Sequence, residues 1–258
     1  MNTFILGPCT METKEIYLGI AKELSDLMSG KNWIFKSSFD KANRSSIEGK
    51  RGCGYDEAIE WFKEVKTIIP DIKLTTDVHE TWQIEGLRDL IDVLQIPAFL
   101  CRQTDMLTEA ARNFDIVNIK KGQWMSPQNM IQGVDKIKNT NSNCQAWCTE
   151  RGSQFGYGQL IVDLGSAGFL RSHFDEVIFD VTHSTQKLKE NGRTGGDREL
   201  AKKYLLTSTV FGYTGLFAEC HPRPEEAYSD KDCQIYLSDM PRLLKQLEGI
   251  SDIISNEE

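Results

Sequence analysis

Short apolar runs alternate with longer amphipathic stretches along the whole chain. Residues 3–9 form an apolar run halted by a Gly-Pro pair, and residues 13–29 then carry apolar side chains at helical spacing. The same pattern recurs and gives eight strand–helix units. The predicted strands are 3–9, 32–37, 72–77, 91–96, 115–120, 143–149, 176–181 and 214–219, and the predicted helices are 13–29, 54–68, 82–89, 103–112, 127–138, 159–172, 197–211 and 235–254.

Consecutive units with short, continuous apolar strands are typical of a parallel sheet covered by helices. Eight is the number of units that closes a (β/α)₈ TIM barrel. A doubly wound open sheet is the alternative, but that fold usually carries a Gly-rich dinucleotide turn, and the sequence contains no G-x-G-x-x-G. We therefore predict an α/β fold, a (β/α)₈ TIM barrel that forms a single domain over residues 1–258.

The charge and composition of the chain narrow its partners and its location. The net charge is −8, the isoelectric point is near 5.2, and the sequence has no long basic stripe. Nucleic acid and anionic membranes are therefore not expected as partners, although a small anionic substrate needs only a local patch. No apolar run reaches the roughly 18–20 residues that span a bilayer. The first residues show no leader, so we expect a cytoplasmic protein.

The seven cysteines agree with that location. They form no C-x-x-C pair, and an odd number cannot all be bridged within one chain. We expect most of them to be reduced and buried as small hydrophobic side chains. Cys9 is an exception, because it stands at the end of the first predicted strand.

A local basic stretch follows the second predicted strand. Residues 35–46 read FKSSFDKANRSS, and residues 36–51 hold five basic and two acidic side chains in an otherwise acidic chain. Cations among hydroxyl and amide groups are suited to phosphate, because they supply both charge and directional donors. A solvated polar loop is the alternative interpretation for this stretch taken alone.

Barrel closure would bring all eight strand ends to one face, so distant residues would meet there. Converging cations at that face would repel one another unless multiply charged anions bind, although each cation singly is also compatible with a surface position. A second set combines a thiol, an imidazole and two carboxylates, which suit Zn²⁺, Fe²⁺ or Mn²⁺. A buried hydrophobic Cys and a core His are the alternatives for that set. The cations are Lys36, Lys41, Arg44, Arg102, Lys120 and Arg151, and the second set is Cys9, His183, Glu219 and Asp230.

The strand ends and their loops also resemble one known family. The segments GPCTMET, FKSSFDKANRSS, TDVHE, IPAFLCRQTD, NIKKGQWMSP, ERGSQFGYGQLIVD, FDVTHSTQ and LFAECHPRPEEAYSD are similar to those of the 3-deoxy-D-manno-octulosonate 8-phosphate synthases, in the same order from about residue 6 to about residue 245. The resemblance implies a homotetrameric barrel enzyme that condenses phosphoenolpyruvate with D-arabinose 5-phosphate and releases phosphate. Its product belongs to the lipopolysaccharide inner core (Kdo) pathway.

The resemblance also implies a role for each residue of the rim. Phosphoenolpyruvate would be held by Lys36, Ser38, Arg102, Lys120, Arg151 and the Ala98 backbone, and the pentose by Lys41 and Asn43. Arg44 and Ser45, reaching across a subunit interface, would bind the pentose 5-phosphate, and Gln186 would also contact substrate. Lys41 and His183 are candidates for proton transfer, with Asp77 orienting one of them.

The resemblance assigns the thiol, imidazole and carboxylates to a metal site. Cys9, His183, Glu219 and Asp230 match the ligands of the metal-dependent branch, whereas the metal-independent branch carries Asn at the position of Cys9. A divalent metal of the Zn, Fe, Mn or Co type is therefore the expected cofactor.

Three other functions fit parts of this pattern. The sister family, the 3-deoxy-D-arabino-heptulosonate 7-phosphate synthases, uses erythrose 4-phosphate and normally shows Lys-Pro-Arg-Thr where this chain has KANRSS at residues 41–46. A metal-dependent sugar-phosphate hydrolase would use the same metal ligands with a phosphate clamp. A barrel that only binds sugar phosphates is the third possibility.

Overall fold

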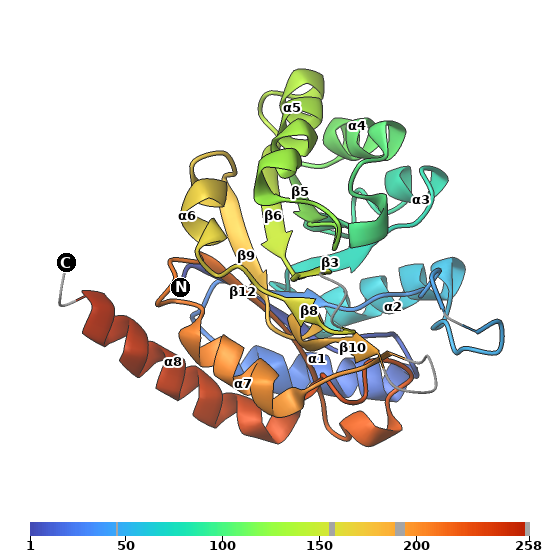
Figure 1. Ribbon diagram of the computed structural model, residues 1–258. Coiled ribbons are helices and arrows are strands. Elements are labelled where there is room, and N and C mark those ends of the chain that lie inside the picture. The colour runs from blue at the N-terminus through green and yellow to red at the C-terminus, as the bar shows by residue number, and fades with distance from the viewer. Residues whose placement is uncertain (45, 155–157, 189–193, 256–258) are drawn as a thin grey trace.

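Eight parallel strands close into a barrel in the computed structural model, which describes residues 1–44, 46–154, 158–188 and 194–255 (Figure 1). The strands are hydrogen-bonded in chain order, and pairing of the first with the last closes the ring. The prediction of a closed barrel rather than an open sheet is confirmed. The strands are β1 (Thr3–Gly7), β2 (Trp33–Lys36), β3 (Leu74–Asp77), β4 (Val93–Ile96), β5 (Ile116–Lys120), β6 (Gln145–Glu150), β9 (Glu176–Asp180) and β12 (Gly215–His221).

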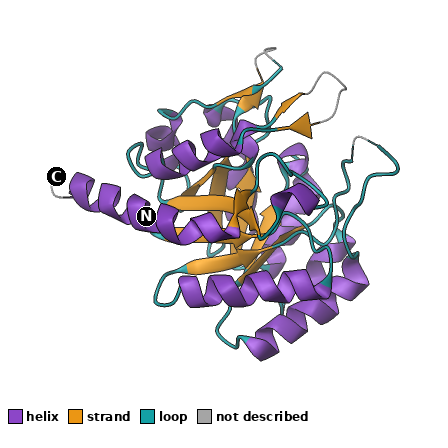
Figure 2. Ribbon diagram, turned by 90° about the horizontal axis from the view of Figure 1, so that it is seen from below, coloured by secondary structure: helices purple, strands orange, loops and turns teal. Residues whose placement is uncertain are grey.

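Helices surround the barrel and bury one face each against it (Figure 2). In the first helix Tyr17, Ile20, Ala21 and Leu24 are buried, which is the spacing of a single helix face. Thr13 begins that helix, because its side chain accepts a hydrogen bond from the Ile16 amide. The helices are α1 (Lys14–Leu27), α2 (Tyr55–Ile68), α3 (Trp82–Glu85), α4 (Thr104–Asn113), α5 (Ile131–Thr140), α6 (Ser166–Arg171), α7 (Arg198–Thr207) and α8 (Met240–Ser255).

The interior of the barrel holds a small apolar core directly below its polar end. Its buried side chains are Ile5, Ile34, Val93, Trp147, Ile178 and Phe217. Because side chains alternate along a strand, the residue two positions later faces the same interior. Ile34 is therefore followed on that face by Lys36, Ile178 by Asp180, and Phe217 by Glu219. The strands therefore place these charged groups directly above the apolar core of the barrel.

Several predicted element boundaries are wrong. The predicted helix 159–172 is in its first part a strand, β8 (Leu160–Ile161), which pairs with β7 (Ser153–Gln154). Leu160 and Ile161 are too short an apolar run to distinguish strand from helix by spacing. The predicted helix 235–254 begins as β13 (Ile235–Tyr236) and a 3₁₀ turn, and the predicted helices 82–89 and 127–138 are respectively shorter and partly 3₁₀. A second hairpin joins β10 (Lys187–Leu188) to β11 (Thr194–Gly195).

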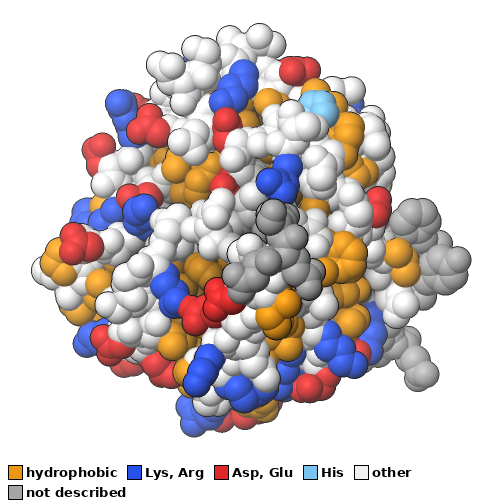
Figure 3. Space-filling view, turned by 90° about the vertical axis from the view of Figure 1, so that its left-hand side faces the viewer, with side chains coloured by type: hydrophobic (Ala, Val, Ile, Leu, Met, Phe, Trp, Pro, Cys, Tyr) orange, Lys and Arg blue, Asp and Glu red, His pale blue; other side chains and the backbone are white. Residues whose placement is uncertain are grey.

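The surface carries mixed charge. On the face shown in Figure 3, Lys and Arg side chains lie among Asp and Glu side chains and form no continuous basic band. None of the described helices combines the length and the apolar character needed to cross a bilayer.

Candidate functional site

A large cavity opens at the carboxyl ends of the barrel strands, with a volume of about 1310 Å³. Most of the residues predicted from the strand ends line it, and Ser38, Cys9 and Glu219 lie buried against lining residues. The predicted residues that line the cavity are Lys36, Lys41, Asn43, Arg44, Asp77, Ala98, Lys120, Arg151, His183, Gln186 and Asp230.

Two predicted site residues are not placed with the others. Arg102 is exposed, does not line the cavity, and accepts a hydrogen bond from Lys136 at its carbonyl oxygen. Ser45 lies outside the described residues. Five of the six predicted cations therefore line the cavity.

Ser38 holds two of these cations over a buried carboxylate. Lys36 Nζ and Lys41 Nζ donate to Ser38 Oγ at 2.7 and 2.8 Å, and Ser38 Oγ donates to Asp77. Burial alone would raise the pKa of Asp77, but the Lys36 and Lys41 ammonium groups hold that pKa well below its ordinary value. Asp77 also lies 3.3 Å from His79 Nε2. An ionised Asp77 thus fixes both ammonium groups at the second and third strand ends.

Asp180 plays the corresponding part on the opposite side of the cavity, although the sequence pattern alone predicted no role for it. Its side chain is fully buried, pairs with Lys120, and lies 2.7 Å from His183 Nδ1. The backbone amides of Thr182 and His183 donate to its other oxygen. Burial would raise the pKa of Asp180, but His183 and Lys120 hold it far below its ordinary value. In the sequence, only its position two residues after Ile178 indicates that its side chain faces the barrel interior.

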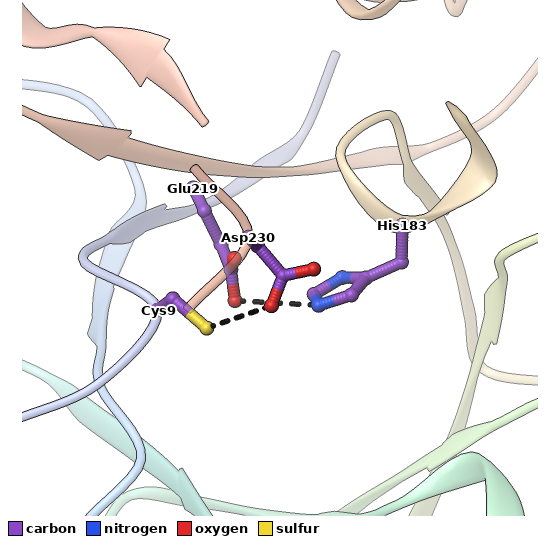
Figure 4. A group of neighbouring side chains, drawn as sticks. All are labelled: Cys9, His183, Glu219 and Asp230. Carbon is purple, nitrogen blue, oxygen red and sulfur yellow. Dashed lines mark hydrogen bonds and ion pairs between the residues drawn. The ribbon is translucent and has the colours of Figure 1, made fainter. Parts of the chain in front are cut away.

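Cys9, His183, Glu219 and Asp230 point toward one another at the base of the cavity (Figure 4). Each offers one ligand atom, and these four atoms lie within 4.8 Å of one another. Cys9 Sγ lies 3.2 Å from Asp230 Oδ2, and His183 Nε2 lies 3.6 Å from Glu219 Oε1. Neither carboxylate oxygen of Glu219 has a hydrogen-bond partner among the described residues. A buried carboxylate that accepts no hydrogen bond is suited to bind a cation. The four predicted residues therefore fit a metal site.

The electrostatics of the thiol agree with that interpretation. Burial raises the pKa of Cys9, and the neighbouring Glu219 carboxylate raises it further. A thiol binds metal as the thiolate, which needs an adjacent cation to form in such surroundings. The two carboxylates, the thiol and the imidazole therefore form a charge cluster that a divalent ion would balance.

The loop that carries Asp230 is fixed by polar contacts. Asp230 has a positive φ of 51°, the one such value at a non-glycine residue in the described chain. Ser229 Oγ donates to Asp230 Oδ2 at 2.6 Å and itself accepts from Arg44 at 2.9 Å. Gln186 Nε2 donates to the other Asp230 oxygen at 2.7 Å, and Gln186 Oε1 accepts from Arg151. Contacts on both carboxylate oxygens hold this unusual backbone conformation.

Replacement of Asp180 should weaken metal binding through His183. A carboxylate on the second ring nitrogen of a ligating His fixes the tautomer and orientation of the ring, and its loss typically costs 10- to 100-fold in metal affinity, so we expect about that loss for Asp180→Asn. Competition with a chelator of known affinity measures it. Asp175→Asn is the matched control, because Asp175 pairs with Lys138 on the surface. Equal metal affinity in both variants would contradict this role.

The fold and the site define a class: a (β/α)₈ barrel with anion-binding cations and a metal-ligand set at the carboxyl ends of its strands. The family model described as the DAHP synthetase I family matches residues 2–256. The chain belongs to this family, and proteins similar to it over nearly its full length include 2-dehydro-3-deoxyphosphooctonate aldolases.

The similarity to these relatives extends over nearly the whole chain. The aldolase of Fusobacterium nucleatum is 44% identical over 97% of this chain and 90% of the relative. The aldolase of Wolinella succinogenes is 42% identical over 96% of this chain and 99% of the relative. That of Helicobacter hepaticus is 40% identical over 97% of each.

Proposed function

We propose that this chain condenses phosphoenolpyruvate, D-arabinose 5-phosphate and water to 3-deoxy-D-manno-octulosonate 8-phosphate and phosphate, in Kdo biosynthesis. The observation that carries the proposal is the identity of 40–44% over nearly the full chain to 2-dehydro-3-deoxyphosphooctonate aldolases. The cavity supports it, because it offers several separate cations to two phosphorylated substrates. The proposal includes a single catalytic domain and a homotetramer, with Arg44 and Ser45 acting at the subunit interface.

The cations are placed to hold two anions at once. Lys36 and Lys120 lie 5.6 and 4.3 Å from the ring centre of Phe217, which forms the apolar floor beneath them. In the proposed assignment, Lys36, Lys120 and Arg151 bind the phosphate and carboxylate of phosphoenolpyruvate, together with Ser38, Arg102 and the Ala98 backbone. Lys41, Asn43, Arg44 and Gln186 bind the pentose phosphate. Holding both substrates in line can contribute roughly 7–11 kcal/mol to lowering the barrier.

The proposed reaction joins C3 of the enol to the aldehyde carbon, adds water at C2, and expels phosphate by breaking the bond between C2 and the bridging oxygen. Lys41 is the candidate for giving a proton to the aldehyde oxygen, because His183, as a metal ligand whose Nδ1 lies 2.7 Å from Asp180, keeps no ring nitrogen free for proton transfer. The fixed cations disperse charge on the leaving phosphate. A divalent ion held by Cys9, His183, Glu219 and Asp230 would polarise the aldehyde or acidify water. This ligand set supports assignment to the metal-dependent branch.

Phosphate release with paired substrates tests the proposed function. We expect release from phosphoenolpyruvate only when arabinose 5-phosphate is also present. Release with erythrose 4-phosphate instead would favour a 3-deoxy-D-arabino-heptulosonate 7-phosphate synthase, the second candidate, which the description of the matching family model favours. Release from one phosphorylated substrate alone would indicate a hydrolase, and no release would indicate a binding protein.

A further inference from the structure

Lys121 is a buried charged residue to which the proposed mechanism gives no role. It directly follows Lys120, but it does not line the cavity and its side chain is only 1% exposed. A lysine is rarely buried so completely unless its ammonium group is paired. Its Nζ lies 2.8 Å from Ser153 Oγ and 3.2–3.4 Å from the carbonyl oxygens of Gly122, Met125 and Gly152.

Glu150 completes this buried group. Its Oε1 lies 3.4 Å from Lys121 Nζ and accepts a hydrogen bond from the Gly152 amide at 2.6 Å. The turn at Gly152 has a φ of +90°, which favours glycine, and an added Cβ would lie 3.0 Å from Leu160 Cβ. The Lys121–Glu150 pair therefore ties the loop that follows β5 to the turn that follows β6.

The two strand ends are built alike. Strands β5 and β6 are paired neighbours, one ending in Lys120-Lys121 and the other in Glu150-Arg151. Successive side chains leave a strand on opposite sides. One residue of each dipeptide, Lys120 or Arg151, lines the cavity, and the other joins the buried pair.

The cavity residues of these dipeptides repel each other. Lys120 and Arg151 are both positively charged, and both line the same cavity from neighbouring strand ends. Like charges on neighbouring strand ends favour their separation, and the Asp180 carboxylate beside Lys120 reduces this repulsion, as a bound anion would. The buried pair resists such a separation, because Lys121 contacts oxygens of both loops.

We propose that Lys121 and Glu150 are positioning residues that fix the spacing of Lys120 and Arg151 and thereby set the affinity for phosphoenolpyruvate. This proposal rests on the proposed function, which assigns phosphoenolpyruvate to those two cations. If it is correct, two residues that do not line the cavity control how tightly the cavity binds phosphoenolpyruvate.

Lys121→Met tests the proposal, because it keeps most of the apolar volume and removes the ammonium group. Binding of phosphoenolpyruvate alone, measured by calorimetry, should weaken between about tenfold and about 100-fold. The KM for arabinose 5-phosphate should change by less than about twofold, because its groups lie elsewhere. Glu150→Gln should weaken phosphoenolpyruvate binding in the same direction, and Lys121→Met/Glu150→Gln should bind better than Lys121→Met, since no buried charge is left unpaired.

Two controls separate positioning from other effects. Lys138→Met removes an ion pair of α5 that lies on the surface, and Val65→Ala weakens the buried core at α2. Both should bind phosphoenolpyruvate as the native protein does. Equal loss for both substrates, or the same loss in Val65→Ala, would overturn the proposal. If Lys121→Met binds phosphoenolpyruvate as tightly as the native protein, the positioning proposal is overturned and the proposed function is not. If the native protein itself binds no phosphoenolpyruvate, both are overturned.

Discussion

Prolonged treatment with a chelator should lower the condensation activity by more than about 10³-fold, and Zn²⁺, Fe²⁺, Mn²⁺ or Co²⁺ should restore it. The physical reason lies in the cluster of Cys9, His183, Glu219 and Asp230, whose ligand atoms are within 4.8 Å of one another. Without a cation, the buried Glu219 carboxylate, the half-buried Asp230 carboxylate and a thiol share this volume, and Glu219 has no hydrogen-bond partner among the described residues. Phosphate release and elemental analysis of the same sample measure the effect.

Cys9→Asn tests the same site without a chelator. The variant should retain less metal than the native protein and lose activity, because an amide is a poor substitute for a thiolate ligand. Cys144→Ala is the matched control, since Cys144 is also buried but directly precedes β6 and lies outside the metal cluster. Full activity of a chelated sample that elemental analysis shows to be free of metal would refute metal dependence.

Much of the barrel was predictable because its strands are short apolar runs that end in polar residues. Lys36, Asp77 and Lys120 end their strands and line the cavity, as the closure of eight units requires. The metal set was separable by chemical type, since a thiol, an imidazole and carboxylates placed at several strand ends on one face of a barrel form a ligand set that suits a divalent metal.

Other features depend on contacts that the sequence does not encode locally. Asp180 was recognisable only as a strand-end acid, because its partner Lys120 comes from the end of another strand, although its other partner, His183, lies three residues further along the chain. Leu160 and Ile161 became a strand through pairing with Ser153 and Gln154, which spacing alone does not reveal. The alternation that places Lys120 in the cavity also directs Lys121 away from it, so two adjacent lysines acquire different tasks.

Lys36→Met should lower kcat/KM for phosphoenolpyruvate by about 10³-fold, at the upper end of the loss expected from removing one fixed charge-stabilising donor. Lys36 is only 3% exposed, and its Nζ lies 2.7 Å from Ser38 Oγ, 3.5 Å from Asp77 and 3.9 Å from Glu219. The substitution therefore removes a substrate cation and also leaves two buried carboxylates without it. The second effect adds to the first, because an unpaired buried charge is costly.

Three measurements separate these effects of Lys36. Lys36→Arg keeps the positive charge, so it should lose less activity than Lys36→Met if charge on the substrate dominates. Lys63→Met is the surface control, since Lys63 pairs with Glu60 on an exposed helix face and exposed pairs contribute at most about 1 kcal/mol. Metal content shows whether the substitution also changes metal retention by the cluster that includes Glu219. Native kcat/KM in a folded, metal-replete Lys36→Met protein would contradict the assignment of Lys36 to phosphoenolpyruvate, whereas loss of activity with loss of metal would place its main role at Glu219.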